Sequence, residues 1–264
     1  NGGNITIINS TISNNNAGNG DGGGIRNIEV LTLVNSTISN NNAGNGDGGG
    51  LFNRELLTLV NSTISGNSAD DAGGGIYNLF SGATATLANN IIADNVADNE
   101  RSDLTNDSGS QVQLTGINLI EVSSISGAGI LNQDPNLSPL QDNGGSTFTQ
   151  IPLDDSPAID AGTNSAVPTD TFDLDDDGDT DEPIPFDQRG FDRVFGEAVD
   201  LGAVELQEGE GAPVEEFPNN INSATNTITI LQETSPETVP VSLGFFFDFA
   251  GTQDATRIID IAAG

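Results

Sequence analysis

The chain contains no histidine, cysteine, lysine, methionine or tryptophan, and each absence removes a class of function. Without histidine and cysteine there is no Ser-His-Asp or Cys-His machinery, no thiolate redox chemistry and no His/Cys zinc site. Without lysine there is no Schiff-base chemistry. The absence of cysteine also means that no disulfide stabilises the fold. What remains is carboxylate chemistry or a function without catalysis.

Positive charge is also scarce. The 264 residues carry 6 basic side chains, all of them arginine, against 39 acidic ones, which gives a formal net charge of −33. A chain this acidic is not expected to bind nucleic acid, and cations are its natural partners. The chain has no run of about 18 apolar residues, the length that would predict a transmembrane helix. The charge favours a secreted or cell-surface location, where calcium or salt screens the carboxylates, although a halophilic cytoplasm would fit it as well.

A regular internal repeat organises the first part of the chain. The motif Asn-Ser-Thr-Ile-Ser begins at positions 9, 35 and 61, a period of 26 residues, and a degraded copy begins at position 89. A Gly-Gly-Gly marker begins at positions 22, 48 and 73. Alternating apolar residues such as Leu31 and Leu33 are typical of short strands. This pattern predicts an all-β fold, a right-handed parallel β-helix with about 26 residues per coil.

The repeat also predicts which side chains lie over one another. Ile12, Ile38, Ile64 and Ile92 are expected to form an aliphatic ladder inside the solenoid, at the strand spacing of roughly 4.8 Å. The asparagines at positions 9, 35, 61 and 89 are expected to form an amide ladder, in which each side chain bonds to the next and to the turn backbone.

Several ordered motifs in the second half resemble a known family. They are Asp-Pro-Asn-Leu-Ser-Pro-Leu at 134–140, Asp-Asn-Gly-Gly-Ser-Thr at 142–147, Ser-Pro-Ala-Ile-Asp-Ala-Gly at 156–162, Asp-Gln-Arg-Gly-Phe at 187–191 and Val-Asp-Leu-Gly-Ala-Val-Glu at 199–205. Together with the coil motifs, they resemble choice-of-anchor Q domain proteins over roughly residues 1–206. The resemblance implies a bacterial surface or secreted parallel β-helix protein, and it implies no catalytic residues.

These patterns divide the chain into four parts. Residues 1–133 are predicted to form the coils, and 134–206 an acidic module that caps the open end of the solenoid. Arg189 and Arg193 lie among Asp187, Asp192 and Asp200, which predicts ion pairs that hold the cap together. Residues 207–218 read as a linker, and 219–264 as a β-strand segment that packs on its own chain or on a neighbouring one.

The cap contains a calcium-loop pattern. Carboxylates occupy the first, third, fifth and ninth positions of the stretch that starts at 173, and Gly178 provides the turn at the sixth. The predicted calcium ligands are Asp173, Asp175, Asp177, Asp179, Asp181 and Glu182. The pattern departs from an EF-hand at the twelfth position, where Ile184 replaces the expected glutamate. The alternative interpretation is a disordered acidic insertion.

The sequence therefore predicts a non-catalytic, calcium-associated structural or adhesive protein of the cell surface or extracellular space. One alternative is a head-to-tail filament, in which the first coil, with Ile5 and Ile7, is covered by Phe245, Phe246 and Phe247 of the next copy.

A second alternative is a polysaccharide-binding or polysaccharide-cleaving β-helix enzyme. Its candidate groups lie in the third and fourth coils and are Asp70, Asp71, Asp94, Asp98 and Arg101.

Overall fold

A computed structural model describes residues 3–97 and 103–210, which belong to one compact unit, Asn1–Val214. The described residues form 17 short strands and a single 3-10 turn at Asn164–Ala166. All strand pairs are parallel, and equivalent strands in the first coils lie 26 residues apart. The predicted parallel β-solenoid is therefore confirmed. The predicted segment 219–264, including Phe245, Phe246 and Phe247, and most of the linker lie outside the described residues.

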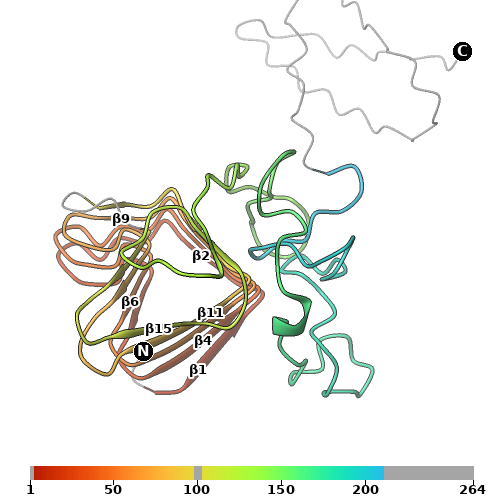
Figure 1. Cartoon of the computed structure of the whole chain (residues 1–264), viewed down its shortest axis with the longest axis horizontal. Coiled ribbons are helices and arrows are strands. Elements are labelled where there is room, and N and C mark those ends of the chain that lie inside the picture. The colour runs from red at the N-terminus through yellow and green to blue at the C-terminus, as the bar shows by residue number, and fades with distance from the viewer. Residues whose placement is uncertain (1–2, 98–102, 211–264) are drawn as a thin grey trace, which may run out of the picture. The chain divides into compact units, whose positions relative to one another are not determined.

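Three parallel sheets form the sides of the solenoid, which encloses its core between them (Figure 1). Sheet 1 contains β1 (Ile5–Ile8), β4 (Val30–Val34), β7 (Leu56–Val60), β11 (Thr84–Ala88) and β15 (Gln111–Leu114). Sheet 2 contains β2 (Thr11–Ser13), β5 (Thr37–Ser39), β8 (Thr63–Ser65), β12 (Ile91–Ala93), β16 (Asn118–Ile120) and β17 (Ile130–Leu131). Sheet 3 contains β3 (Ile25–Asn27), β6 (Leu51–Asn53), β10 (Ile76–Asn78) and β14 (Leu104–Asn106). A short pair, β9 (Ser68–Ala69) and β13 (Val96–Ala97), completes the coils.

Residues in the left-handed backbone conformation form the corners between these sheets. The asparagines that begin each repeat, at positions 9, 35, 61 and 89, have φ between 46° and 55° and turn the chain from sheet 1 into sheet 2. Asparagine adopts this conformation more readily than most residues because its short polar side chain bonds locally. Gly22, Gly48 and Gly73, with φ between 64° and 73°, turn the chain into sheet 3. The repeated Asn and Gly motifs are thus corner residues.

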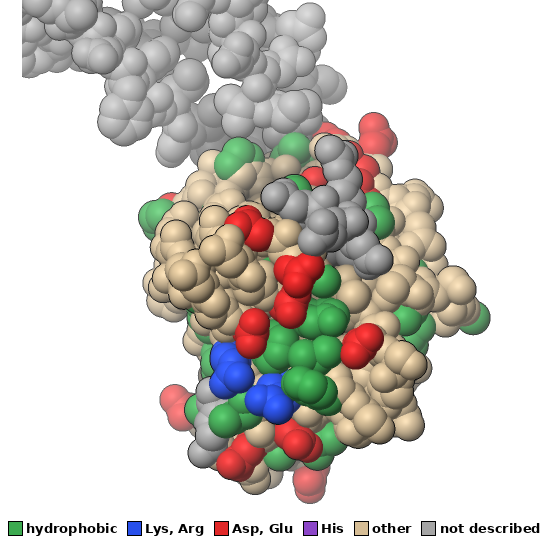
Figure 2. All heavy atoms as spheres, turned by 90° about the vertical axis from the view of Figure 1, so that its left-hand side faces the viewer, with side chains coloured by type: hydrophobic (Ala, Val, Ile, Leu, Met, Phe, Trp, Pro, Cys, Tyr) green, Lys and Arg blue, Asp and Glu red, His purple; other side chains and the backbone are tan. Residues whose placement is uncertain are grey.

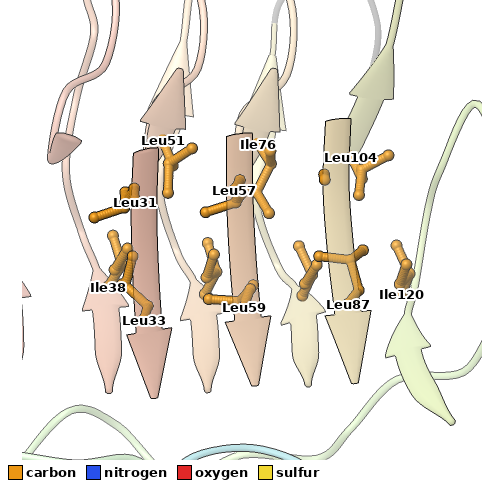
Figure 3. Packing of buried hydrophobic residues seen from close by; sticks show 13 residues of the cluster. Leu31, Leu33, Ile38, Leu51, Leu57, Leu59, Ile76, Leu87, Leu104 and Ile120 are labelled. Carbon is orange, nitrogen blue, oxygen red and sulfur yellow. The ribbon is translucent and has the colours of Figure 1, made fainter. Parts of the chain in front are cut away.

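The interior is a set of apolar ladders (Figure 3). The predicted isoleucine ladder is confirmed, because Ile12, Ile38, Ile64 and Ile92 occupy paired positions of neighbouring strands. Ile120 extends it by one coil. Ile38, Ile64 and Ile92 have no solvent-exposed surface. Leucines from sheet 1 and apolar residues from sheet 3 close the core from the other two sides.

The amide ladders lie elsewhere than predicted. Of the asparagines at 9, 35, 61 and 89, only Asn89 donates from its amide to another in the set, at 3.1 Å to Asn61 Oδ1. Two continuous ladders run instead through residues 15, 41, 67 and 95 and through residues 27, 53, 78 and 106, with Nδ2–Oδ1 distances of 2.7–2.9 Å. The prediction was wrong for most of the first set; Asn35 Nδ2, for example, donates to the Phe186 carbonyl at 2.7 Å instead of to a neighbouring asparagine of the set.

The turns between sheets 3 and 1 absorb changes in coil length. Residues 54–55 join β6 to β7, whereas residues 79–83 join β10 to β11. Ile76 nevertheless pairs with Leu51, and Thr84 pairs with Leu56. The longer turn therefore leaves the strand register unchanged on both sides.

The module at 134–206 covers a side of the solenoid rather than its end. The Ala203 amide donates to Thr63 Oγ1 at 3.1 Å, and Thr37 Oγ1 donates to Gln188 Oε1 at 2.7 Å. A second apolar cluster joins Ile91 on the outer face of sheet 2 to Ala158 and Leu201. The predicted end cap is wrong because the outer face of sheet 2 is itself apolar and hydroxyl-rich, and needs a partner. We refer to residues 134–206 as the flanking module.

Candidate metal centre

The acidic loop of the flanking module is the turn of a small hairpin. Thr169 and Pro183 form an antiparallel bridge, the Asp170 amide donates to the Glu182 carbonyl at 2.7 Å, and the Ile184 amide donates to the Pro168 carbonyl at 2.9 Å. Asp173, Asp176 and Gly178 have positive φ, which closes the turn between the two sides. We call residues 168–184 the acidic hairpin.

Three carboxylates meet at the base of the acidic hairpin. Asp170, Asp175 and Glu182 each present an oxygen, and these oxygens lie within 4.8 Å of one another. Asp170 has no solvent-exposed surface, and its Oδ2 accepts a hydrogen bond from the Leu174 amide at 2.7 Å. Its Oδ1 and Glu182 Oε1 are buried and have no hydrogen-bond partner among the described residues. We call this the base group.

A second group lies nearer the tip of the hairpin. Asp173, Asp175 and Asp177 again present oxygens within 4.8 Å of one another. Backbone amides of the turn donate to these side chains, from Gly178 to Asp173 Oδ1 at 3.1 Å and from Asp177 to Asp175 Oδ1 at 3.3 Å. We call this the tip group; it shares Asp175 with the base group.

Only some of the predicted ligands belong to the base group or the tip group. Asp173, Asp175, Asp177 and Glu182 each belong to one of the two groups. Asp179 and Asp181 belong to neither; Asp179 Oδ1 accepts from the Asp181 amide at 2.9 Å and is exposed. Ile184, at the position of the EF-hand glutamate, is only 4% exposed and faces the cavity beside sheet 1. Glu182 therefore supplies the carboxylate from the closing side of the hairpin.

Asp170 is the group member that the sequence pattern did not identify. It precedes the Asp-x-Asp-x-Asp-Gly stretch by three residues, and it joins the group because the Thr169–Pro183 bridge folds the two ends of the hairpin together. The two ends have the sequences Pro-Thr-Asp (168–170) and Glu-Pro-Ile (182–184), and neither pattern marks the pairing.

The electrostatic environment of the hairpin favours a cation. The pKa of Glu182 is raised above its ordinary value, first by desolvation and then by the negative charges of Asp175, Asp177, Asp179 and Asp170. Carboxylates that repel one another in this way are stabilised together when a divalent cation lies between them. Calcium prefers such oxygen ligands, so the residues of the hairpin fit this ion.

A cavity of about 270 Å³ lies where the acidic hairpin meets sheet 1. Thr6, Ile8, Thr32 and Val34 line it from β1 and β4, and Pro168, Thr169, Thr171, Phe172 and Ile184 line it from the hairpin. The lining contains apolar groups and hydroxyls, with no titratable side chain. This composition offers no acid or base for catalysis.

Two arginines form buried ion pairs in the flanking module, as predicted, but of the three aspartates named beforehand only Asp187 takes part, and the other partners are Glu205 and Glu210. Arg189 pairs with Asp187 at 3.0 Å and with Glu210 at 2.8 Å, and Arg193 pairs with Glu205 at 3.1 Å. Burial raises the pKa of Glu205 to about 7 and lowers that of Arg193. Desolvation thus outweighs the mutual attraction of this pair, which is expected for a fully buried salt bridge.

Arginine and aromatic side chains gather on the outer face of sheet 3. Arg26, Phe52 and Tyr77 occupy paired positions of β3, β6 and β10; Arg26 lies 5.7 Å from the Phe52 ring, and the Phe52 and Tyr77 rings are 5.9 Å apart. Arg54 lies 4.5 Å from the Phe80 ring. Figure 2 shows basic side chains on this face, beside hydrophobic groups and with acidic groups around them. We call it the arginine–aromatic face.

Of the candidate groups for a polysaccharide-cleaving enzyme, the structure describes Asp70, Asp71 and Asp94. The Asp94 amide donates to Glu121 Oε2 at 3.2 Å, and the pKa of Asp94 is raised by desolvation and by the charges of Glu121 and Asp134. Asp70 and Asp71 are exposed, whereas Asp98 and Arg101 lie outside the described residues.

Comparisons with known proteins leave function to be inferred from these sites alone. A scan of protein-family models, a search of curated proteins and a search of solved structures each found no match. In the part of the chain that the structure describes, no helix has the length and hydropathy needed to cross a membrane. A β-solenoid supports many unrelated functions, so the fold by itself does not choose among them.

Proposed function

We propose that this chain is a non-catalytic structural or adhesive module of a secreted or cell-surface protein, and that calcium bound at the acidic hairpin stabilises it. The observation that carries the proposal is the convergence of carboxylates from residues 170–182 in two groups that share Asp175. The ligands proposed from the sequence are Asp173, Asp175, Asp177, Asp179, Asp181 and Glu182. Asp179 and Asp181, which lie outside both groups, would contribute mainly through negative charge.

The placement of the most perturbed carboxyl groups supports a role without catalysis. Burial raises the pKa of Asp103 to about 6, yet Asp103 ends an amide ladder, where it accepts from Asn95 Nδ2 at 2.9 Å. Glu205 is equally engaged by Arg193. Perturbed carboxyl groups in an active site normally face a cleft that admits substrate. Both of these groups instead hold the fold together.

The proposal also includes a location outside the cell or on its surface, and membership in the choice-of-anchor Q family. A net charge of −33 is tolerated best where divalent cations are abundant, as they are outside cells. The order of the motifs between residues 134 and 205, following β-solenoid coils, supports membership in the choice-of-anchor Q family of surface or secreted proteins.

Calcium titration by calorimetry, after removal of bound metal, tests the proposal. We expect calcium to bind and to raise the melting temperature, and potassium chloride at matched ionic strength without calcium not to do so. A parallel screen of neutral and uronate polysaccharides should show no bond cleavage. Cleavage by the unaltered chain that disappears in Asp94→Asn would replace the structural role with an enzymatic one, and absence of calcium binding would refute the calcium-associated role.

A second candidate function, polysaccharide binding, is favoured by the arginine–aromatic face. Phe80 is 45% exposed and has a φ of 82°, a strained conformation for an aromatic residue that is found more often at functional sites. Aromatic rings stack on sugars, and arginine binds carboxylates. Uronate polysaccharides should therefore bind, and Phe80→Ala with Arg54→Ala should abolish the binding in an affinity-gel assay; equal retention of the variant would refute this role.

Self-association is the remaining proposed partner. In the first coil, Ile5 is 43% exposed and Ile7 partly exposed, whereas their partners Leu31 and Leu33 are buried. Among the described residues β1 pairs only with β4, and a strand edge without a partner pairs readily with another chain. Light scattering with calcium present should show concentration-dependent growth that Ile5→Lys prevents; a monomer at every concentration would exclude the filament.

A further inference from the structure

We infer that the base group, Asp170, Asp175 and Glu182, is the principal calcium site, and that Asp170 is its buried anchor. The inference rests on the proposed calcium-associated function and deepens it, because it moves the ion from the loop that the sequence pattern marks to the closed end of the hairpin. It also assigns a ligand that lies outside that pattern.

The buried oxygens of the base group need a partner. Asp170 has no exposed surface and uses Oδ2 for the Leu174 amide at 2.7 Å, which leaves Oδ1 unpaired among the described residues. Glu182 Oε1 is buried and unpaired in the same way. A buried carboxylate oxygen without a hydrogen bond or counter-charge strongly destabilises a fold. A cation between these oxygens removes both penalties at once.

The spacing of the base group fits calcium. Its three ligand oxygens lie within 4.8 Å of one another. Because calcium binds oxygen at roughly 2.3–2.6 Å, two oxygens on one ion can be up to about 5 Å apart. Asp175 and Glu182 are partly exposed, so water can complete the 6–8 ligands that calcium takes, roughly, in proteins. Magnesium binds oxygen at about 2.0–2.1 Å in near-octahedral geometry, so it needs its ligand oxygens within about 4.2 Å of one another, a tighter arrangement than calcium needs.

The tip group lacks the same need. Asp177 is exposed, and backbone amides already donate to its Oδ1 and to Asp173 Oδ1 at 2.7 and 3.1 Å. Water and these amides solvate the tip carboxylates whether or not an ion is present. The tip is therefore a weaker site than the base.

An ion at the base would affect how the hairpin contacts the solenoid. Asp170 is flanked by Thr169 and Thr171, which line the cavity beside β1 and β4. Ile184, two residues from Glu182, lines the same cavity. Binding at the base thus fixes both sides of the hairpin at the point where it meets sheet 1, whereas binding at the tip would order only the turn.

The test compares Asp170→Asn with Asp179→Asn by calcium calorimetry on the full chain. Both variants remove one negative charge from the same hairpin, and the amide oxygen introduced by Asp170→Asn can still accept from the Leu174 amide. We expect Asp170→Asn to weaken calcium binding at least ~30-fold and Asp179→Asn to weaken it less than ~3-fold, on the scale of charge-neutralisation effects. Equal affinities for the unaltered chain and Asp170→Asn would overturn the inference.

A stability measurement guards against misfolding of the variant. In chelator, Asp170→Asn should melt at or above the temperature of the unaltered chain, because it removes an uncompensated buried charge; in calcium the order should reverse. Glu182→Gln should behave like Asp170→Asn. If Asp170→Asn melts lower than the unaltered chain in chelator, Asp170 supports the fold without a metal and the inference fails.

The outcomes separate this inference from the proposed function. If the unaltered chain binds no calcium, both fail. If it binds calcium, and the binding is lost in Asp173→Asn and Asp177→Asn but kept in Asp170→Asn, the calcium-associated role stands and only the base site is refuted. A comparison of calcium with magnesium alone then checks the identity of the ion: we expect magnesium to bind at least ~30-fold more weakly, and equal binding would contradict calcium as its natural ligand.

Discussion

In the solenoid, each stabilising contact is repeated once per coil, whereas in the flanking module each occurs once. Asn41 donates to Asn67, and Asn67 donates in the same way to Asn95 in the next coil; Ile38 likewise pairs with Ile64, its equivalent one coil on. Arg193, by contrast, holds Glu205 and two backbone carbonyls at one point of the flanking module. Stability is therefore distributed in the coils and concentrated in the module, so single substitutions should act differently in the two regions.

The largest effect is expected from the concentrated contact. Arg193→Met should reduce the free energy of unfolding of the module by about 3–5 kcal/mol, because it removes the counter-charge of the buried Glu205 and the donors to the Asp200 and Gly202 carbonyls. Arg26→Met is the matched control; its pair with Asp21 is exposed and 3.7 Å long, so the loss should stay below about 1 kcal/mol. Denaturant unfolding measures both, and equal losses would contradict the contrast between the regions.

The second-largest effect is expected from a substitution at a buried asparagine of an amide ladder. Asn67→Ala removes the acceptor for the Asn41 amide at 2.9 Å and the donor to the Ile38 carbonyl at 3.0 Å, and the unpaired groups should lower the free energy of unfolding by about 2–4 kcal/mol. Asn45→Ala breaks an equivalent but exposed bond to Asn19, so it should change stability by less than about 0.5 kcal/mol. A similar result for both would mean that burial does not strengthen the ladder.

A pH effect distinguishes the ladder's end from its interior. Burial raises the pKa of Asp103 to about 6 from 3.8, so the folded chain binds this proton more tightly than the unfolded chain does. This tighter proton binding stabilises the folded chain fully below about pH 4. The stabilisation is lost as the pH rises through about 6, which lowers the free energy of unfolding by about 1–3 kcal/mol. Asp103→Asn should remove this share of the pH dependence when the two proteins are unfolded in urea between about pH 4 and 7; parallel curves would refute it.

The smallest effect on the coils is expected from removing calcium. Chelation should speed hydrogen exchange in the acidic hairpin and leave the amides of β5 and β8 unchanged, because the coil ladders contain no ion ligand in our proposal. Exchange that quickens equally in both regions would show that the flanking module also maintains the solenoid.

The sequence predicted the coils far better than the module. Identical residues 26 positions apart are explained by stacking, so the Ile12–Ile38–Ile64 register could be inferred directly. Two sets of asparagine share this period, however, and the spacing cannot tell which set turns the chain and which bonds along the axis.

The module has no period, and its placement depends on contacts between distant residues. That it lies against sheet 2 follows from Thr63 and Ile91 facing outwards, which alternation alone did not reveal. Asp170 was missed for the same reason: its membership in the base group depends on the pairing of Thr169 with Pro183, fourteen positions away.

The five-residue turn at 79–83 has a practical consequence. It is three residues longer than the turn at 54–55, yet the rungs before and after it pair without interruption. An engineered loop should therefore be accepted at this corner without disturbing the pairing of the strands before and after it.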